Sequence, residues 1–409
     1  MKTKNLLLVT GMAAVIGFTP AAALEIFSWW TTGGEAAALK ALFDAYSKED
    51  PQAKMVNAAI AGGAGTNAKA VLKTRVLGGN PPDSFQVHMG AELFDTWVSG
   101  GFMEPVDAIY QETELAAALP EQLLDYLRSD EGTYYTVPLN VHRANVLWYN
   151  QKVLADAGLE PPESWEEFLQ AAEPLKAKGI TPLALGDNGI WATTQILETI
   201  LLAELGPDGY RGLWDGSTPW DSPAVTKSLE TLSQVLDNAN PDHAARSWDQ
   251  ANDMVIQGTA AMTIMGDWAV ADYQAKKFSG YGYAPVPGTA GVYDGSSDTF
   301  GLPKKAPNRE QALAWLELVA SKEGQETFNT VKGSICARTD CDPEKFGEYQ
   351  RWAMESWSQD ELVPSLAHGA AASEAWMSQI DNAVNLFVAR KDVKATQAML
   401  VQAAQEALR

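Results

Sequence analysis

The side chains that could carry out chemistry are scattered along the chain and match no catalytic motif. Of the four histidines, His88 ends an expected strand and His368 lies in a segment of small residues. Their spacing does not suit a metal site, and each could equally be a buried core histidine. No serine lies in a Gly-x-Ser-x-Gly turn, so a hydrolase triad has no local support. Acidic residues are abundant, but their spacing selects no catalytic pair. We expect no metal or cofactor.

Two features near the amino end could contact a small molecule. The Gly-rich segment 61–65 lacks both G-x-G-x-x-G and Gly-Lys-Ser/Thr, which disfavours phosphate binding. It is either an ordinary loop or a place where the backbone closely approaches a neutral ligand. Glu35 begins an expected helix, where the helix dipole favours a carboxylate. Because Glu35 closely follows Trp29 and Trp30, it could instead accept hydrogen bonds from hydroxyl groups.

The elements that must position these side chains alternate between strand and helix. Apolar runs predict strands at 24–30, 53–60 and 84–88, with amphipathic helices between them. This βαβαβ order implies a parallel sheet with right-handed crossovers. Ligands of such sheets bind at the carboxyl ends of the strands. We therefore expect Trp29 and Trp30, segment 61–65, and Gln86 with His88 to lie close together.

The remainder of the chain has mixed patterns and no internal repeat. Strands are expected at 133–138 and 144–149, and the Ser/Gly-rich segment 288–297 has the composition of a loop. Helices are expected at 191–205, 223–238, 250–258, 309–319, 322–331 and 373–408. No long linker separates two domains, so two lobes joined by several crossing segments fit best.

Composition and charge exclude several classes of protein. The chain has 409 residues, 46% of them hydrophobic and 20% charged, an ordinary globular balance long enough for two domains. Asp and Glu number 52 against 30 Lys and Arg, so the formal charge of −22 disfavours nucleic acid and anionic lipid as partners. Fourteen tryptophans are many, and some could face a ligand.

The amino-terminal segment predicts export. Lys2 and Lys4 precede an apolar run, and Ala21–Ala23 supplies a small-residue cleavage site, so we expect a signal peptide over residues 1–23. The only cysteines, Cys336 and Cys341, enclose four residues. In an oxidising compartment nearby thiols normally pair, which favours a local disulfide over free thiols. A metal site would need a second pair of ligands that the sequence lacks.

Several motifs, in one order, resemble those of bacterial extracellular solute-binding proteins of family 1, the sugar-binding proteins of ABC importers, and most closely the glucose-binding members. The resemblance spans the chain from residue 24 onward and rests on segments 26–35, 79–88, 135–138, 148–150, 161–165, 258–268 and 332–335. Each motif is weak alone, but together they are specific.

The resemblance implies a set of sugar-contacting residues. A hexose presents apolar C–H faces and a rim of hydroxyl groups, so its site needs flat aromatic rings and polar partners. The matching positions are Trp29, Trp30, Trp248 and Trp268 for the faces and Glu35, Gln86, His88, Asp298, Lys332 and His368 for the rim. His142 and Arg143 also match the family, either as sugar contacts or as supports of a crossing segment. Trp97, Trp148, Trp165, Trp315 and Trp352 are assigned to core or surface.

The family's fold is the type II periplasmic-binding-protein fold, two α/β lobes with a hinge and a ligand cleft between them. On this basis we expect residues 24–137 and 285–335 in the amino-terminal lobe, and 138–284 and 336–409 in the carboxyl-terminal lobe. Such lobes close on their ligand by hinge motion.

The expected function is a monomeric periplasmic protein that captures a sugar, glucose by resemblance, and delivers it to the membrane subunits of an ABC permease. It would perform no chemistry on the sugar. Two alternatives remain: a secreted glycoside hydrolase, and a sugar-binding protein that serves mainly a chemoreceptor. Galactose, mannose or a disaccharide could replace glucose.

Overall fold

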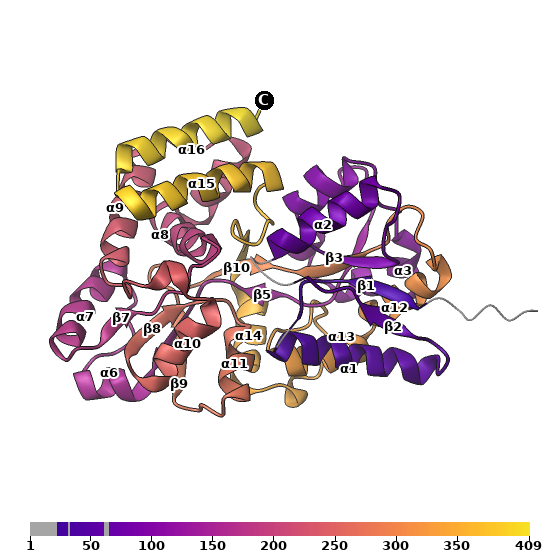
Figure 1. Cartoon of the computed structure of the whole chain (residues 1–409), viewed down its shortest axis with the longest axis horizontal. Coiled ribbons are helices and arrows are strands. Elements are labelled where there is room, and N and C mark those ends of the chain that lie inside the picture. Colours follow the sequence, from indigo (N-terminus) through magenta and orange to yellow (C-terminus); the bar gives the residue numbers. More distant parts are fainter. Residues whose placement is uncertain (1–22, 32, 61–64) are drawn as a thin grey trace, which may run out of the picture.

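The chain folds into two α/β lobes that lie side by side, with a third, small sheet at their junction (Figure 1). The structure, a computed structural model, describes residues 23–31, 33–60 and 65–409. The predicted signal peptide and most of the Gly-rich segment 61–65 lie outside the described residues. Within those residues, no helix combines the length and apolar character that crossing a membrane requires.

The amino-terminal lobe is built on a five-stranded sheet with the order β2-β1-β3-β11-β4. Its strands are β1 (Leu24–Phe27), β2 (Met55–Asn57), β3 (Ser84–His88), β4 (Thr136–Pro138) and β11 (Asp298–Gly301). The expected parallel βαβαβ unit is confirmed, because β1 pairs in parallel with both β2 and β3. The first two strands are shorter than predicted. β11 enters from far along the chain and pairs antiparallel with β3 and β4.

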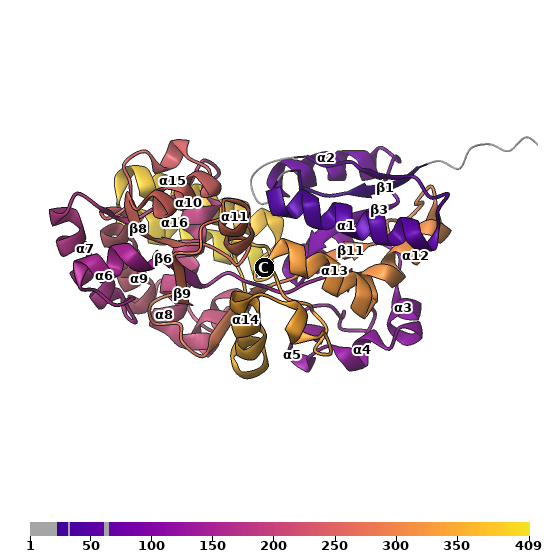
Figure 2. The same cartoon turned by 90° about the horizontal axis from the view of Figure 1, so that it is seen from below.

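Helices cover both faces of this sheet. They are α1 (Gly33–Glu49), α2 (Thr66–Leu77), α3 (Asp107–Glu112), α4 (Leu115–Ala118), α5 (Glu121–Leu124), α12 (Arg309–Ala320) and α13 (Lys322–Lys332), with a π-helix, η2 (Glu92–Val98), after β3. Helices α1 and α13 run side by side along the lobe (Figures 1 and 2).

The carboxyl-terminal lobe has a four-stranded sheet with the order β7-β8-β6-β9. Its strands are β6 (Val146–Asn150), β7 (Thr181–Leu183), β8 (Ala260–Ile264) and β9 (Tyr281–Pro285). Its helices are α6 (Gln151–Ala157), α7 (Trp165–Ala177), α8 (Trp191–Asp215), α9 (Pro223–Leu236), α10 (Trp248–Gln257), α11 (Ala269–Ala275), α15 (Glu374–Arg390) and α16 (Val393–Ala407), with a 3-10 turn, η3 (His243–Ala245).

The predicted single helix over 373–408 is wrong. Lys391 adopts a left-handed conformation with φ of 51°, which ends α15, and Asp392 caps the start of α16. The break lets α16 fold back along α15 (Figure 1).

The junction between the lobes is a three-stranded sheet with the order β12-β10-β5. It joins β5 (His142–Arg143), β10 (Val292–Ser296) and β12 (Glu361–Pro364); the 3-10 turn η4 (Pro343–Lys345) and α14 (Glu348–Gln359) precede β12. Segment 288–297, expected to be a loop, therefore contains a buried strand. The polar composition of the segment gave the wrong prediction because pairing with β12 and β5 satisfies its backbone groups. This pairing depends on the tertiary structure. The lobe boundaries given above stay a proposal.

Arg143 holds this junction together from inside. Its guanidinium is fully buried and donates to Asp360 at 2.9 Å, to Asn145 at 3.1 Å and to the carbonyl of Val292 at 3.0 Å. Its charge also lies over the Tyr293 ring, 5.1 Å from the ring centroid. Of the two interpretations left open for Arg143, the structure favours the support of a crossing segment.

The disulfide prediction is confirmed, since Cys336 and Cys341 are bonded and pack against Phe346. The tryptophans assigned to core or surface, among them Trp97, Trp148 and Trp315, are packed away from the interlobe cavity described below.

Glycines allow the segment after β12 to touch the amino-terminal lobe. Ala91 and Glu92 donate their backbone N–H groups to Ala370 and Gly369, at 3.0 and 2.9 Å. A Cβ on Gly90 would lie 2.4 Å from the Ala370 carbonyl oxygen. This close approach connects η2 to the segment that carries His368.

We expect Gly90→Ala to destabilise the protein more than Gly79→Ala. The two glycines have almost the same φ, 76° and 75°, so backbone strain of about 1–2 kcal/mol affects both equally. Only Gly90 faces a contacting backbone, whereas a Cβ on Gly79 meets nothing within 4 Å. Overpacking should add about 1–3 kcal/mol to the loss at Gly90, measured by urea unfolding. Equal losses of unfolding free energy in the two variants would show that the contact with Ala370 accommodates the added Cβ without destabilising the protein.

Candidate functional site

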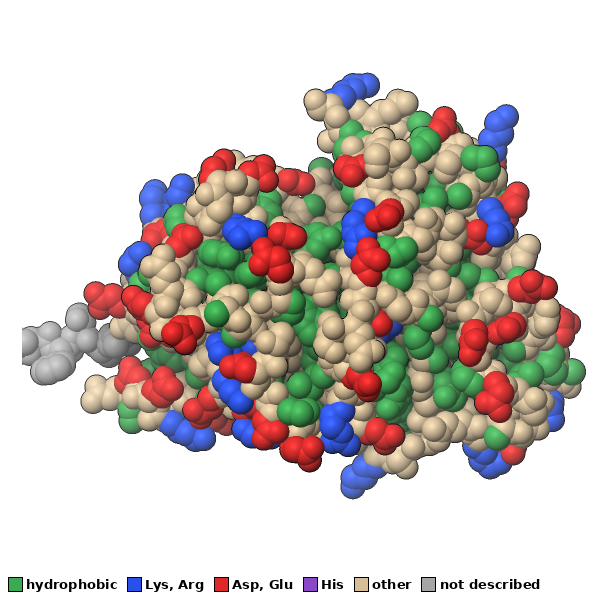
Figure 3. All heavy atoms as spheres, turned by 180° about the vertical axis from the view of Figure 1, so that it is seen from behind, with side chains coloured by type: hydrophobic (Ala, Val, Ile, Leu, Met, Phe, Trp, Pro, Cys, Tyr) green, Lys and Arg blue, Asp and Glu red, His purple; other side chains and the backbone are tan. Residues whose placement is uncertain are grey.

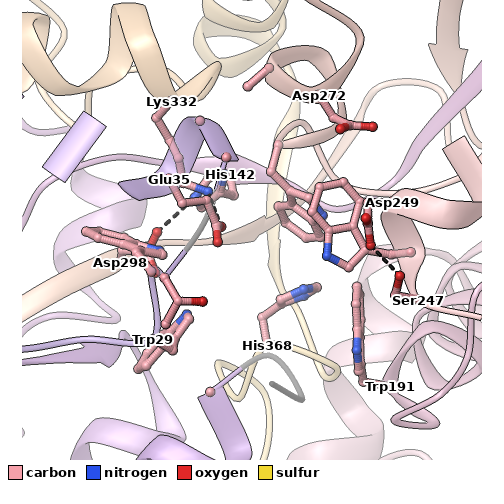
Figure 4. Close-up of a pocket in the computed structure, with 18 of the residues that line it drawn as sticks. Trp29, Glu35, His142, Trp191, Ser247, Asp249, Asp272, Asp298, Lys332 and His368 are labelled. Carbon is pink, nitrogen blue, oxygen red and sulfur yellow. Dashed lines mark hydrogen bonds and ion pairs between the residues drawn. The ribbon is translucent and has the colours of Figure 1, made fainter. Parts of the chain in front are cut away.

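A cavity of about 500 Å³ lies between the lobes (Figure 4). This volume falls in the range of about 300–1,000 Å³ that is usual for small-molecule sites. The predicted site residues that line it are Trp29, Trp30, Glu35, His88, Trp248, Trp268, Asp298, Lys332 and His368. Both lobes and the crossing segments therefore contribute to one cavity.

Aromatic rings form much of the wall. Trp29 and Trp30 follow β1, where the sequence placed them, and Trp268 precedes α11. Trp191, which the sequence analysis missed, begins α8 and lies 6.2 Å from Trp268 between ring centroids. Trp30 is only 1% exposed and packs against Phe328, so a small part of its ring faces the cavity.

Asp298 is the polar centre of the cavity. Its carboxylate accepts hydrogen bonds from Gln86 at 2.6 Å, from Asn140 at 2.9 Å and from His142 at 2.8 Å. Burial alone would raise its pKa, but the hydrogen bond and charge of His142 hold the pKa well below the usual range. Asp298 is therefore ionised at neutral pH and serves as an acceptor.

Gln86 lies behind the cavity wall. Its amide donates to Asp298 and accepts from the backbone N–H of Trp29 at 3.3 Å. The structure thus connects it to two lining residues and leaves it out of the lining itself.

His142, whose role the sequence left open, lines the cavity between two carboxylates. Its Nδ1 bonds Asp267 and its Nε2 bonds Asp298. Burial and the charge of Lys332 oppose protonation, but Asp267 and Asp298 outweigh them and raise the pKa of His142 to about 9. The ring is an imidazolium at neutral pH and balances charge in the site.

The group that orients His88 lies on the side of its ring that faces away from the cavity. The Nδ1 of His88 lies 2.9 Å from Glu92, which also accepts from Lys69 at 2.5 Å. Burial favours the neutral form of Glu92, yet the charges of Lys69 and His88 lower its pKa to about 2. The Nε2 of His88 lies 3.7 Å from Asp298, too far for a hydrogen bond and open to a ligand group.

His368 presents the third imidazole. Its Nδ1 lies 2.9 Å from the Ser365 hydroxyl, and its Nε2 has no hydrogen-bond partner among the described residues. Burial, with the charges of His88 and His142, lowers the pKa of His368 well below its usual value. The ring is neutral and points into the cavity (Figure 4).

Lys332 and Glu35 close one side of the cavity. They form an ion pair of 2.7 Å between the end of α13 and the first turn of α1. Lys332 is 2% exposed and lies 6.0 Å from the Trp268 ring centroid. Glu35 is thus both favoured by the helix dipole and placed to accept from a ligand, so its two interpretations are compatible.

Other lining residues carried no recognisable pattern in the sequence. They include Asn188, Ser247, Asp249, Asp272 and Ser296. Ser247 and Asp249 bond each other at the start of α10, a pairing that helix caps commonly show, so only the fold places them at a cavity. No cluster of His, Cys, Asp or Glu within the described ranges could hold a metal ion.

The cavity is suited to a neutral ligand rich in hydroxyl groups. Ionised Asp298 and the neutral imidazole of His368 accept hydrogen bonds, Lys332 donates them, and tryptophan rings cover apolar faces. Such a cavity between two hinged lobes defines a binding protein of the type II periplasmic fold.

The chain belongs to the bacterial extracellular solute-binding protein family, whose model matches residues 30–326. It is 38% identical to an ABC transporter extracellular-binding protein of Pyrococcus horikoshii, over 94% of this chain and 88% of that one. It is 31% identical to a probable sugar-binding periplasmic protein of Brucella suis, over 96% and 93%. Relatives named for particular sugars include a xylose/arabinose-binding protein of Haloferax volcanii, at 29%, and a glucose-binding protein of Saccharolobus solfataricus, at 26%.

The fold is shared with solved solute receptors. The receptor AcbH, described as preferring β-D-galactopyranose, superposes with a TM-score of 0.85, covering 95% of this chain and 99% of that one at 20% identity. The predicted fold class is therefore confirmed.

His142 should stabilise the folded protein in a defined pH window. Its pKa is about 9 when folded and about 6.5 when unfolded, so its contribution is full below pH 6.5 and is lost as pH rises through 9. The loss amounts to roughly 3 kcal/mol. The difference in unfolding free energy between the wild type and His142→Gln, measured in urea from pH 6 to 9.5, should shrink by that amount. A difference independent of pH would contradict an imidazolium here.

Proposed function

We propose that this protein is the periplasmic substrate-binding component of an ABC importer. We further propose that its ligand is a monosaccharide and that glucose is the preferred one. The observation that carries the proposal is the interlobe cavity, which tryptophan rings of both lobes line together with the hydrogen-bonding centre at Asp298. Its volume suits one or two sugar rings. The family and the sugar-binding names of relatives that span nearly the whole chain support the sugar class.

The roles of individual residues follow from the geometry. Trp29, Trp248 and Trp268 would cover the C–H faces of the pyranose, and Asp298, Glu35 and Lys332 would bond its hydroxyl groups. Gln86 would act indirectly by fixing Asp298.

A binding role is favoured over glycoside hydrolysis. A retaining or inverting hydrolase needs a carboxylic acid that is protonated near neutral pH. Asp298 is held ionised by its hydrogen bonds, and Glu35 is paired with Lys332. The carboxylate at the centre of the cavity, Asp298, therefore accepts hydrogen bonds and does not donate a proton.

Delivery would depend on closure of the lobes. A ligand that touches both lobes stabilises the closed form, and a permease that recognises this form takes the sugar. Charged side chains of both signs are interspersed over the face shown in Figure 3. A chemoreceptor would recognise the same closed form, so it stays an alternative partner. We also propose that the protein is a monomer.

A panel of sugars should identify the ligand. D-glucose, D-galactose, D-mannose, D-xylose, L-arabinose and cellobiose are added to the purified protein and its melting temperature is measured. A ligand that binds only the folded state stabilises it by RT ln(1 + [L]/Kd), about 2.7 kcal/mol at 100-fold Kd. Glucose should give the largest shift and be recovered unchanged after long incubation. A hydrolysed or altered sugar would refute the binding role, and a larger shift with another sugar would replace glucose.

Trp268→Ala should abolish tight sugar binding and leave a folded protein. Removing an aromatic platform costs up to about 3–5 kcal/mol when the ring is well packed. Trp165→Ala is the matched control, because Trp165 is 7% exposed against 9% for Trp268 but lies on α7 outside the cavity. Calorimetric titration with glucose should show the loss in Trp268→Ala alone. Wild-type affinity in that variant would place the site elsewhere.

A further inference from the structure

Glu198, on α8 outside the cavity lining, is linked to His368 through one hydroxyl group. The Ser365 hydroxyl lies 3.0 Å from Glu198 Oε1 and 2.9 Å from His368 Nδ1. The backbone N–H of Ala367 donates to Glu198 Oε2 at 2.8 Å. Glu198, Ser365 and His368 are at least nine-tenths buried, so this chain of hydrogen bonds is shielded from solvent.

The carboxyl group of Asp294, on β10, acts on Glu198 through its charge. Neither oxygen of Asp294 has a hydrogen-bond partner among the described residues. Burial and the charge of Asp294 raise the pKa of Glu198 well above its usual value. Both oxygens of Glu198 accept hydrogen bonds, Oε1 from the Ser365 hydroxyl at 3.0 Å and Oε2 from the Ala367 N–H at 2.8 Å.

This arrangement fixes the direction of every hydrogen bond up to the cavity. Ser365 has a single hydroxyl proton and gives it to Glu198, so its oxygen accepts from His368 Nδ1–H. His368 is neutral and carries only that ring proton. Its Nε2 is therefore a buried lone-pair acceptor with no partner among the described residues, on a ring that lines the cavity (Figure 4). The charged or titratable groups around the ring are His88, His142, Asp298 and Lys69.

We propose that Glu198 and Ser365 are positioning residues that hold His368 as the Nδ1–H tautomer, so that its Nε2 accepts a hydrogen bond from a ligand hydroxyl. The proposal rests on the proposed function, because it states which hydrogen-bonding group of the sugar His368 requires. The amino-terminal lobe repeats the arrangement, with Glu92 on the Nδ1 of His88. A ligand must then offer a hydroxyl donor toward His368, and a fluorine in place of that hydroxyl cannot donate this hydrogen bond.

The tautomer is measured first, in sugar-free protein labelled with ¹⁵N-histidine, by long-range ¹H–¹⁵N correlation. The wild type should show Nδ1–H at His368. Ser365→Ala removes the acceptor and should shift the ring toward Nε2–H. Glu198→Ala removes the acceptor of the Ser365 hydroxyl, which can then donate to Nδ1, so this variant should also shift the ring toward Nε2–H. Ser228→Ala is the matched control, since that buried hydroxyl bonds only the carbonyl of Ala224 within α9.

Affinity for D-glucose is then measured by calorimetry on the same variants. Ser365→Ala and Glu198→Ala should weaken binding about tenfold, whereas Ser228→Ala should stay within about threefold. Monodeoxyfluoro-D-glucoses should identify one position whose fluorine weakens binding to the wild type more than to Ser365→Ala.

The two proposals fail in different ways. An Nε2–H tautomer in the wild type, or an unchanged affinity in Ser365→Ala, would overturn the positioning role. If none of the panel sugars binds, the proposed function fails, and the ring-nitrogen signals alone still decide whether Glu198 and Ser365 set the tautomer.

Discussion

The site depends on one buried negative charge, the carboxylate of Asp298 at the start of β11. An isolated charge in a protein interior is costly, so the surrounding chain must supply donors and an opposite charge. Gln86 from β3, Asn140 from the crossing segment and His142 from β5 do so. Because these donors come from elements far apart in sequence, satisfying Asp298 requires that the amino-terminal sheet and the junction form together.

Other buried charged groups near Asp298 also require partners of opposite charge. His142 needs Asp267 as its second partner, which brings the segment before α11 of the other lobe to the cavity. Glu92 is held between Lys69 and His88 beneath the opposite wall. Buried ion pairs contribute little net stability once desolvation is counted, but breaking one is expensive. Their effect here is to fix the positions of the groups that face the cavity.

The segment after β12 contacts both lobes. Its Ser365 bonds Glu198 on α8, and its Gly369 and Ala370 bond the backbone of η2. His368 lies between these two attachments. The position of His368 in the cavity therefore depends on contacts with both lobes.

The sequence by itself determined the elements whose causes are local. The βαβαβ order follows from periodic apolar residues, and it placed Trp29, Trp30 and His88 at neighbouring strand ends; the nearness of Cys336 and Cys341 predicted their disulfide. Only the tertiary structure decided that segment 288–297 contains a strand and that Trp191 and Asp249 reach the cavity. The reason is physical: the strand in this segment pairs with β12 and β5, and His142 bonds Asp267, which is 125 residues away. Local periodicity carries no information about such distant partners.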